Sequence, residues 1–130
     1  MNLLQNPLDG FSPAHYLATL NAVARSDGLV PVEEQLLEQH AARFDVDLND
    51  LPEVPRDLSE VPWATRVLVY RDALMLAFAD HDELSPEESD YLDQLAGRMD
   101  LPEDIASRIL AWTRSYGDLL DELMELLEEP

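Results

Sequence analysis

Hydrophobic residues recur at helical spacing near the start of the chain. Leu17, Leu20 and Val23 follow the three-to-four-residue period that places side chains on one face of a helix. The pair Ser12-Pro13 puts a capping hydroxyl and a proline where such a helix begins. The sequence therefore predicts a first helix that ends at Asp27-Gly28, because glycine readily adopts the left-handed conformation found after helices.

Three further segments also have helical character. Pro31 begins a second apolar pattern, which continues to Phe44. The segment from about Trp63 to Ala79 is apolar almost all round, and a helix with so little polar face belongs in the middle of a bundle. Ser85 and Glu88 have the spacing of a capping box, in which each side chain bonds the backbone of the other, so a fourth helix is expected to begin there.

The last part of the chain carries one long apolar stripe. Leu101-Pro102-Glu103 begins a fifth helix, and after Gly117 an acidic amphipathic segment either continues that helix or turns away from it. The leucines of this segment are Leu119, Leu120, Leu123, Leu126 and Leu127. We expect the stripe to fold back and complete the bundle. If the upstream helices already close the core, the same leucines would bind a groove, a protein partner or a second copy of the chain.

The chain also repeats itself. Residues 22–33 and 77–88 share one pattern at a constant offset, and the match continues from Leu37 with Leu92 to Asp45 with Asp100. Each copy ends a helix, passes an acidic turn and starts a second helix at a proline, and neither copy could bury its apolar face alone. We predict one all-α domain over residues 1–130, a compact five-to-six-helix bundle built from two pseudo-symmetric helix–turn–helix repeats. Its parts are repeat 1 at about 12–46, a connector at 47–62, repeat 2 at about 63–101 and a C-terminal helix at 102–129.

The connector is rich in proline. Pro52, Pro55 and Pro62 exclude a continuous helix because proline lacks the amide hydrogen that a helix interior needs. We expect an extended connection with at most one helical turn, lying within the domain rather than between two domains.

The amino-acid composition excludes several classes of function. The net charge is −20 and lysine is absent, so Schiff-base chemistry and a lysine-bearing phosphate loop are excluded, and binding to DNA, RNA or an anionic membrane is disfavoured. There is no cysteine, which excludes disulfides and thiolate metal sites. No secretory signal and no membrane-spanning apolar run is readable, so we expect a cytoplasmic protein without membrane insertion. Since no catalytic constellation stands out either, we predict that the chain is not an enzyme.

The two acidic turns are the candidate metal sites. Clustered carboxylates suit a divalent cation such as calcium, magnesium, manganese or zinc. The candidate ligands are Asp27, Glu34, Asp80, Asp82 and Glu88. A structural interpretation also stands, because Asp-Gly is a common turn pair and a glutamate in a first helical turn favours the helix dipole.

The pattern Ala-x-x-Asp-Gly-x-Val-x-x-x-Glu at 24–34, which recurs with changes at 79–89, resembles the signature of the tellurite-resistance TerB-like family. The same fold occurs in the N-terminal domain of DjlA-type membrane co-chaperones. The resemblance implies a bacterial all-helical domain with internal pseudo-symmetry, no established catalytic activity and a stress-response or scaffolding context. It also implies cation binding through Asp27 and Glu34, and through Asp82 in the second copy, where Ser89 replaces Glu34 and Glu88 is the nearest carboxylate.

Two functions follow as hypotheses. The first is a non-enzymatic TerB-like adaptor or stress-response module that engages a protein partner, with a divalent cation in the acidic turns. The alternative is an acidic inhibitor or immunity-type protein that imitates nucleic-acid charge and blocks a basic protein cleft. Binding by the alternative would collapse with added salt.

Overall fold

A computed structural model describes residues 10–26, 28, 31–78 and 84–128 of the chain. These residues form five α-helices and no strand. The helices are α1 (Pro13–Arg25), α2 (Pro31–Phe44), α3 (Trp63–Ala77), α4 (Pro86–Arg98) and α5 (Glu103–Leu127). The all-α prediction is confirmed. The described residues contain no separate sixth helix, because α5 continues through Gly117 without interruption.

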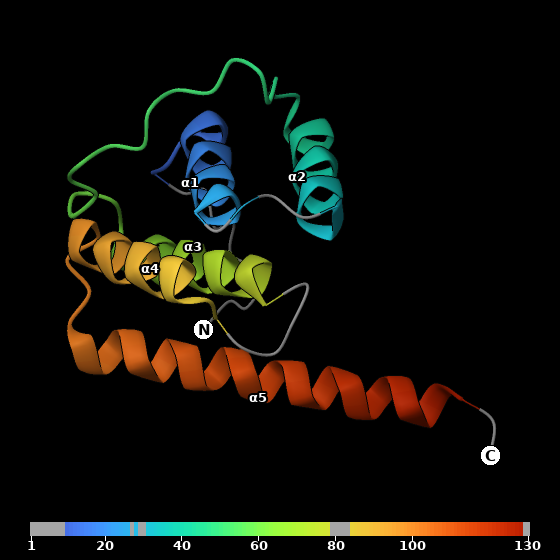
Figure 1. Ribbon diagram of the computed structural model, residues 1–130. Coiled ribbons are helices and arrows are strands. Elements are labelled where there is room, and N and C mark those ends of the chain that lie inside the picture. Colours follow the sequence, from blue (N-terminus) through green and yellow to red (C-terminus); the bar gives the residue numbers. More distant parts are fainter. Residues whose placement is uncertain (1–9, 27, 29–30, 79–83, 129–130) are drawn as a thin grey trace.

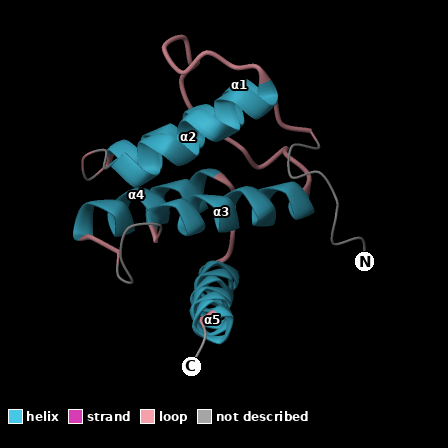
Figure 2. Cartoon of the chain, turned by 90° about the vertical axis from the view of Figure 1, so that its right-hand side faces the viewer, coloured by secondary structure: helices cyan, strands magenta, loops and turns pink. Residues whose placement is uncertain are grey.

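The helices are arranged in three layers. Helices α1 and α2 lie above α3 and α4, and α5 runs beneath them (Figure 1). A view along the axis of α5 shows the same order (Figure 2). Helix α3 contacts each of the other four helices, which confirms the prediction that the apolar segment beginning at Trp63 lies in the middle of the bundle.

Two helices begin with the caps that the sequence predicts. The Ser12 hydroxyl accepts a hydrogen bond from the His15 amide at 3.1 Å at the start of α1. At the start of α4 the Glu88 amide donates to the Ser85 hydroxyl at 3.0 Å, and the Ser85 amide donates to the Glu88 carboxylate at 3.1 Å. The capping box is therefore confirmed. Each such cap stabilises its helix by about 1 kcal/mol.

Helices α2 and α4 end in the same way. Asp45 has φ 55° and Asp100 has φ 52°, the left-handed conformation of a residue that follows a helix. The Val46 amide donates to the Ala41 carbonyl at 2.9 Å, and the Leu101 amide donates to the Ala96 carbonyl at 3.0 Å. These equivalent bonds lie at positions that the sequence repeat pairs. The superposition of two whole repeats as pseudo-symmetric units stays a prediction.

The connector packs against the body of the domain. Leu58 is buried, and its amide donates to the Arg98 carbonyl at 2.8 Å. As expected, no continuous helix forms in residues 47–62, which contain hydrogen-bonded turns such as that between Asp47 and Asp50. Among the helices in the described part of the chain, none has the length and apolar character needed to cross a bilayer.

The core joins all five helices. Its fully buried large side chains come mainly from α1, α3 and α4, and α5 adds one buried aliphatic side chain, Ile109, in its N-terminal third. The principal members are Leu17, Leu20, Val23, Leu37, Val69, Leu74, Leu92, Leu95 and Met99. A core that is closed by so little of α5 leaves most of that helix on the surface.

Candidate functional site

The acidic turns are only partly represented in the structure. Asp27, Asp80 and Asp82 lie outside the described residues. Glu34 is exposed on the first turn of α2. Glu88 is 3% exposed, and its carboxylate accepts a hydrogen bond within the α4 capping box. Across residues 10–26, 28, 31–78 and 84–128, no group of three or more His, Asp or Glu side chains is placed to hold a metal ion.

Helix α5 divides into two halves with opposite environments. Residues 103–117, the docked half, pack against α3 through Ile109 and Thr113, both buried. The Thr113 hydroxyl donates to the Ile109 carbonyl at 2.8 Å, so its polar atom is satisfied within the helix. Residues 118–127, the tail, extend past the other helices (Figure 1).

The tail exposes every leucine that the sequence singled out. Their exposed fractions are Leu119 64%, Leu120 41%, Leu123 49%, Leu126 75% and Leu127 70%, and Met124 among them is 62% exposed. The expectation that this stripe folds back to complete the bundle is therefore wrong. Its physical reason is the continuity of α5: a straight helix that stays in register through Gly117 carries the leucines away from the core.

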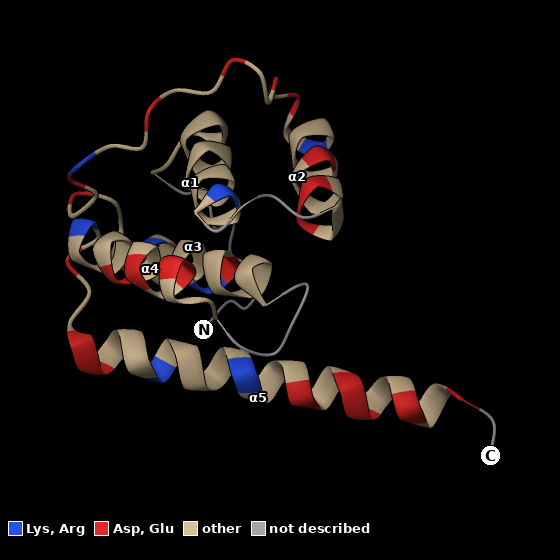
Figure 3. Cartoon of the chain, in the orientation of Figure 1, with Lys and Arg blue, Asp and Glu red and all other residues tan. Residues whose placement is uncertain are grey.

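Charge on the tail is segregated from the leucines. Successive residues of an α-helix are turned by about 100°, so Asp118, Asp121 and Glu125 lie opposite Leu119 and Leu123. Acidic residues recur along the C-terminal part of α5 (Figure 3). The tail is thus an amphipathic helix whose apolar face has no covering element among the described residues.

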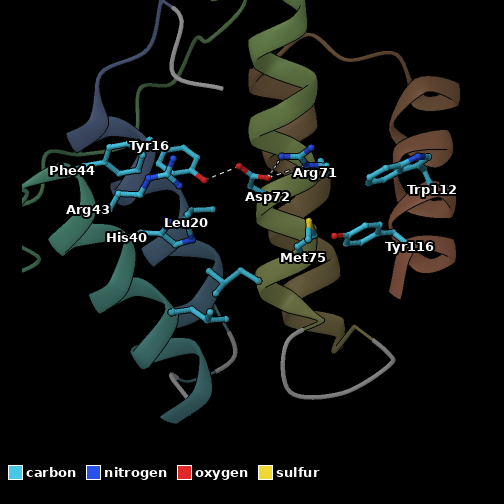
Figure 4. A pocket seen from close by; sticks show the side chains of 12 residues that line it. Tyr16, Leu20, His40, Arg43, Phe44, Arg71, Asp72, Met75, Trp112 and Tyr116 are labelled. Atoms are coloured by element: carbon cyan, nitrogen blue, oxygen red, sulfur yellow. Dashed lines mark hydrogen bonds and ion pairs between the residues drawn. The ribbon is translucent and has the colours of Figure 1, made fainter. Parts of the chain in front are cut away.

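A groove adjoins the apolar face of α5. It has a volume of about 530 Å³ and lies between the α1–α2 layer, α3 and α5 (Figure 4). It is lined by Tyr16, Leu20, Leu36, His40, Arg43, Phe44, Arg71, Asp72, Met75, Leu76, Trp112 and Tyr116. Trp112 is 51% exposed and stacks on Tyr116, with ring centroids 5.4 Å apart. This aromatic pair continues the leucine stripe into the groove.

One polar network crosses the groove. The Tyr16 hydroxyl donates to Asp72 at 2.7 Å, and the Arg71 guanidinium donates to the other oxygen of the same carboxylate at 2.7 Å and 3.0 Å. Burial, and then the Asp72 charge, raise the pKa of Tyr16 well above its ordinary value. The phenol therefore stays protonated and ties α1 to α3.

The groove is also the place where cationic side chains meet exposed apolar surface. Arg43 is exposed on α2 and lies over the Phe44 ring, with its guanidinium carbon 5.3 Å from the ring centroid. Arg71 points toward the same space from α3 (Figure 4). His40 is partly buried, and its ring lies nearly perpendicular to that of Tyr16, with centroids 6.1 Å apart. Tryptophan, tyrosine, methionine and arginine are the residue types enriched in protein interfaces.

Sequence reasoning missed the groove. Each of its aromatic residues lies on an apolar helical stripe, and such a stripe predicts core packing without showing which positions the neighbouring helices fail to cover. The only readable signal is the position of Trp112 and Tyr116 just before the leucine stripe.

Comparison with known proteins gives no relative. No family model, no curated protein and no solved structure matches this chain. The function has to be inferred from the residues and their arrangement.

Proposed function

We propose that this chain is a non-enzymatic interaction module whose α1–α4 body holds α5 so that the tail presents a leucine-rich face to a protein partner. The observation that carries the proposal is the exposure of all five tail leucines on a regular helix. Together with Met124 they form a contiguous apolar surface of a kind that marks interaction sites on soluble domains. An amphipathic helix of this type is a common recognition element, because one apolar face can fill a complementary groove.

The resemblance to the TerB-like family adds a cellular role to the proposal. The TerB-like resemblance supports an adaptor role in a bacterial stress response, in the cytoplasm, and it is carried only by the repeated acidic-turn pattern at 24–34 and 79–89. Cation binding in those turns is a separate component of the proposal. It is supported by the concentration of carboxylates in the sequence there.

Photo-crosslinking in cells that express the chain tests the proposal. A photoreactive phenylalanine derivative would replace Leu123 on the apolar face of the tail, and a matched variant would carry it in place of Glu125 on the opposite face. We expect a discrete protein adduct from the Leu123 position and none from the Glu125 position. Irradiated cells that yield no adduct from Leu119, Leu123 or Leu127 would show that the apolar face is not a binding surface.

An acidic inhibitor that imitates nucleic acid is the second candidate. One observation favours it: the exposed carboxylates of Asp118, Asp121 and Glu125 make no ion pair within the described part of the chain, so their charge is available to a basic partner. This function predicts the reverse crosslinking result, with the adduct formed from the Glu125 position. It also predicts that binding weakens steeply as salt is added, because exposed charges are screened.

The cation component has its own test. Thermal unfolding would be followed while calcium, magnesium, manganese or zinc is titrated into the wild type, Asp27→Ala, Asp82→Ala and a control variant, Glu128→Ala, just after α5. A cation at a hundred times its dissociation constant adds about 2.7 kcal/mol to the free energy of unfolding. Loss of this gain in the two turn variants alone supports a site. An equal, shallow rise in all variants, reproduced by sodium chloride, means screening of the net charge and removes the cation from the proposal.

A further inference from the structure

The tail and the groove have complementary chemistry on one molecule. The tail offers an apolar face with carboxylates beside it, and the groove offers exposed aromatic rings, Met75 and the cations of Arg43 and Arg71 (Figure 4). The tail cannot enter the groove of its own chain, since α5 is one continuous helix that borders the groove with Trp112 and Tyr116 and then leads away. The partner for each surface must therefore be another molecule.

We propose that the tail of one copy of this chain lies in the groove of a second copy, and that the second tail lies in the first groove, so that two α5 helices pair antiparallel about a two-fold axis. This inference rests on the proposed function, for which it names the partner. In a two-fold pair, residue i contacts residue j and residue j contacts residue i. A pair centred between Leu119 and Leu120 sets Leu123 against Tyr116 of the other copy and Leu127 against Trp112.

The spacing along α5 suits this pairing. Trp112, Tyr116, Leu119, Leu123 and Leu126 follow alternating steps of three and four residues, which keep side chains on one seam between two helices. The acidic residues Asp118 and Glu125 lie on the far side of this seam, so most of the like charge of the two tails is directed away from the contact.

Charge complementarity favours a second copy over a basic partner for the groove. Two cations line the groove that the tail would fill: Arg43, which is exposed, and Arg71, which is partly buried. Glu122 lies one helical turn from both Leu119 and Leu126, at the edge of the apolar face, where a carboxylate can approach an arginine of the other copy. Of these two arginines, Arg71 already forms an ion pair, with Asp72. Arg43 stacks over Phe44 and is the arginine that Glu122 of the other copy would approach.

The available area is sufficient. Side chains of this size present roughly 150–250 Å² each when fully exposed, so the exposed fractions of the six apolar tail residues, Trp112 and Tyr116 amount to on the order of 800 Å². A stable interface buries about 800 Å² on each partner. The two symmetry-related contacts, each of which contains an aromatic pair, meet the size and composition of a specific dimer.

Sedimentation equilibrium over a wide range of protein concentration, at about 0.15 M ionic strength where the Debye length is about 8 Å, tests the inference. We expect the wild type to dimerise. The double variant Leu123→Glu, Leu127→Glu should raise the dimer dissociation constant more than about tenfold, because each buried leucine contributes more than the free energy of a tenfold change. Asp118→Ala, on the opposite face of the tail, is the matched control and should leave dimerisation unchanged. Circular dichroism of each variant checks that the helices are intact.

A charge exchange makes the test specific to the groove. Arg43→Glu and Glu122→Arg should each weaken dimerisation, and an equimolar mixture of the two variants should recover it, since each groove then meets a tail of opposite charge. A wild type that stays monomeric at every concentration, or a dimer that neither groove nor tail substitutions weaken, overturns the inference. A Leu123 photo-adduct with a different protein, formed by a monomeric chain, would retain the proposed function and reject the second copy as its partner.

Discussion

The two halves of α5 share one hydrophobic period and have opposite environments. In the docked half, Ile109 and Thr113 are buried against α3, whereas in the tail each leucine remains at least two-fifths exposed. The difference in exposure follows from the lengths of the two packed helices, α5 and α3. Helix α5 has 25 residues and α3 has 15, so α5 is longer than its main neighbour by about 15 Å. Periodicity reports that a face is apolar, and the length of the adjacent helix decides whether that face is core or surface.

The largest expected effect tests the comparison directly. Ile109→Ala should lower the free energy of unfolding by about 3 kcal/mol, because it removes buried methyl groups and leaves a cavity beside α3. Leu123→Ala in the tail should change it by less than about 0.5 kcal/mol, as for other exposed positions. Urea denaturation at a protein concentration that keeps the chain monomeric measures both. Equal losses in the two variants would mean that the tail belongs to the core.

The stability of the folded domain should also decrease at alkaline pH, because a tyrosine on α3 is buried. Burial, and then the charge of Asp93, raise the pKa of Tyr70 to about 12. The folded state therefore holds the phenolic proton more tightly than the unfolded state, whose tyrosines titrate near pH 10. The resulting stability, on the order of 2 kcal/mol, is fully present below pH 10 and is lost as the pH rises towards 12. Tyr70→Phe should flatten the fall of the melting temperature over this interval, and an unchanged fall would contradict the assignment.

The smallest effect concerns the junction of the two halves. Gly117 has helical geometry, and an added Cβ would meet no atom within 4 Å. Gly117→Ala should therefore raise the free energy of unfolding by about 0.5–1 kcal/mol, because alanine loses less backbone entropy in a helix. Gly28→Ala is the contrasting control, since Gly28 has φ +84° and alanine is strained there. Thermal unfolding should show opposite signs, and a neutral or destabilising Gly117→Ala would mean that α5 is not continuous at this point.

Much of the fold could be predicted from local chemistry. Ser12-Pro13 and the Ser85–Glu88 capping box fix two helix starts to the residue, because a cap is formed by groups that are close in sequence. The central position of α3 follows from its apolar composition alone. The left-handed aspartates at 45 and 100 were paired by the repeat, but their conformation was not expected, since glycine is the usual residue there.

The candidate site was predictable only in its residues. The sequence singles out Leu119 to Leu127 as an apolar stripe, yet whether Gly117 breaks α5 depends on a helix-propensity cost of about 0.5–1 kcal/mol and on packing upstream. The groove depends on four helices, α1, α2, α3 and α5, which include segments distant in sequence, so no local pattern encodes it. Of the predicted metal ligands, Glu88 has a structural role in its helix cap and Glu34 is exposed, while the three aspartates lie outside the described residues.

The tail has one further consequence, for hydrogen exchange. A helix of about ten residues is marginal in water by itself, so the tail depends on the docked half of α5 as its nucleus. Its backbone amides should open by fraying from the Leu127 end, with exchange protection that falls steadily from Gly117 onward. Any molecule that covers the leucines suppresses this fraying and restores protection. Amide exchange along residues 118–127 therefore measures, residue by residue, how much of the tail is occupied.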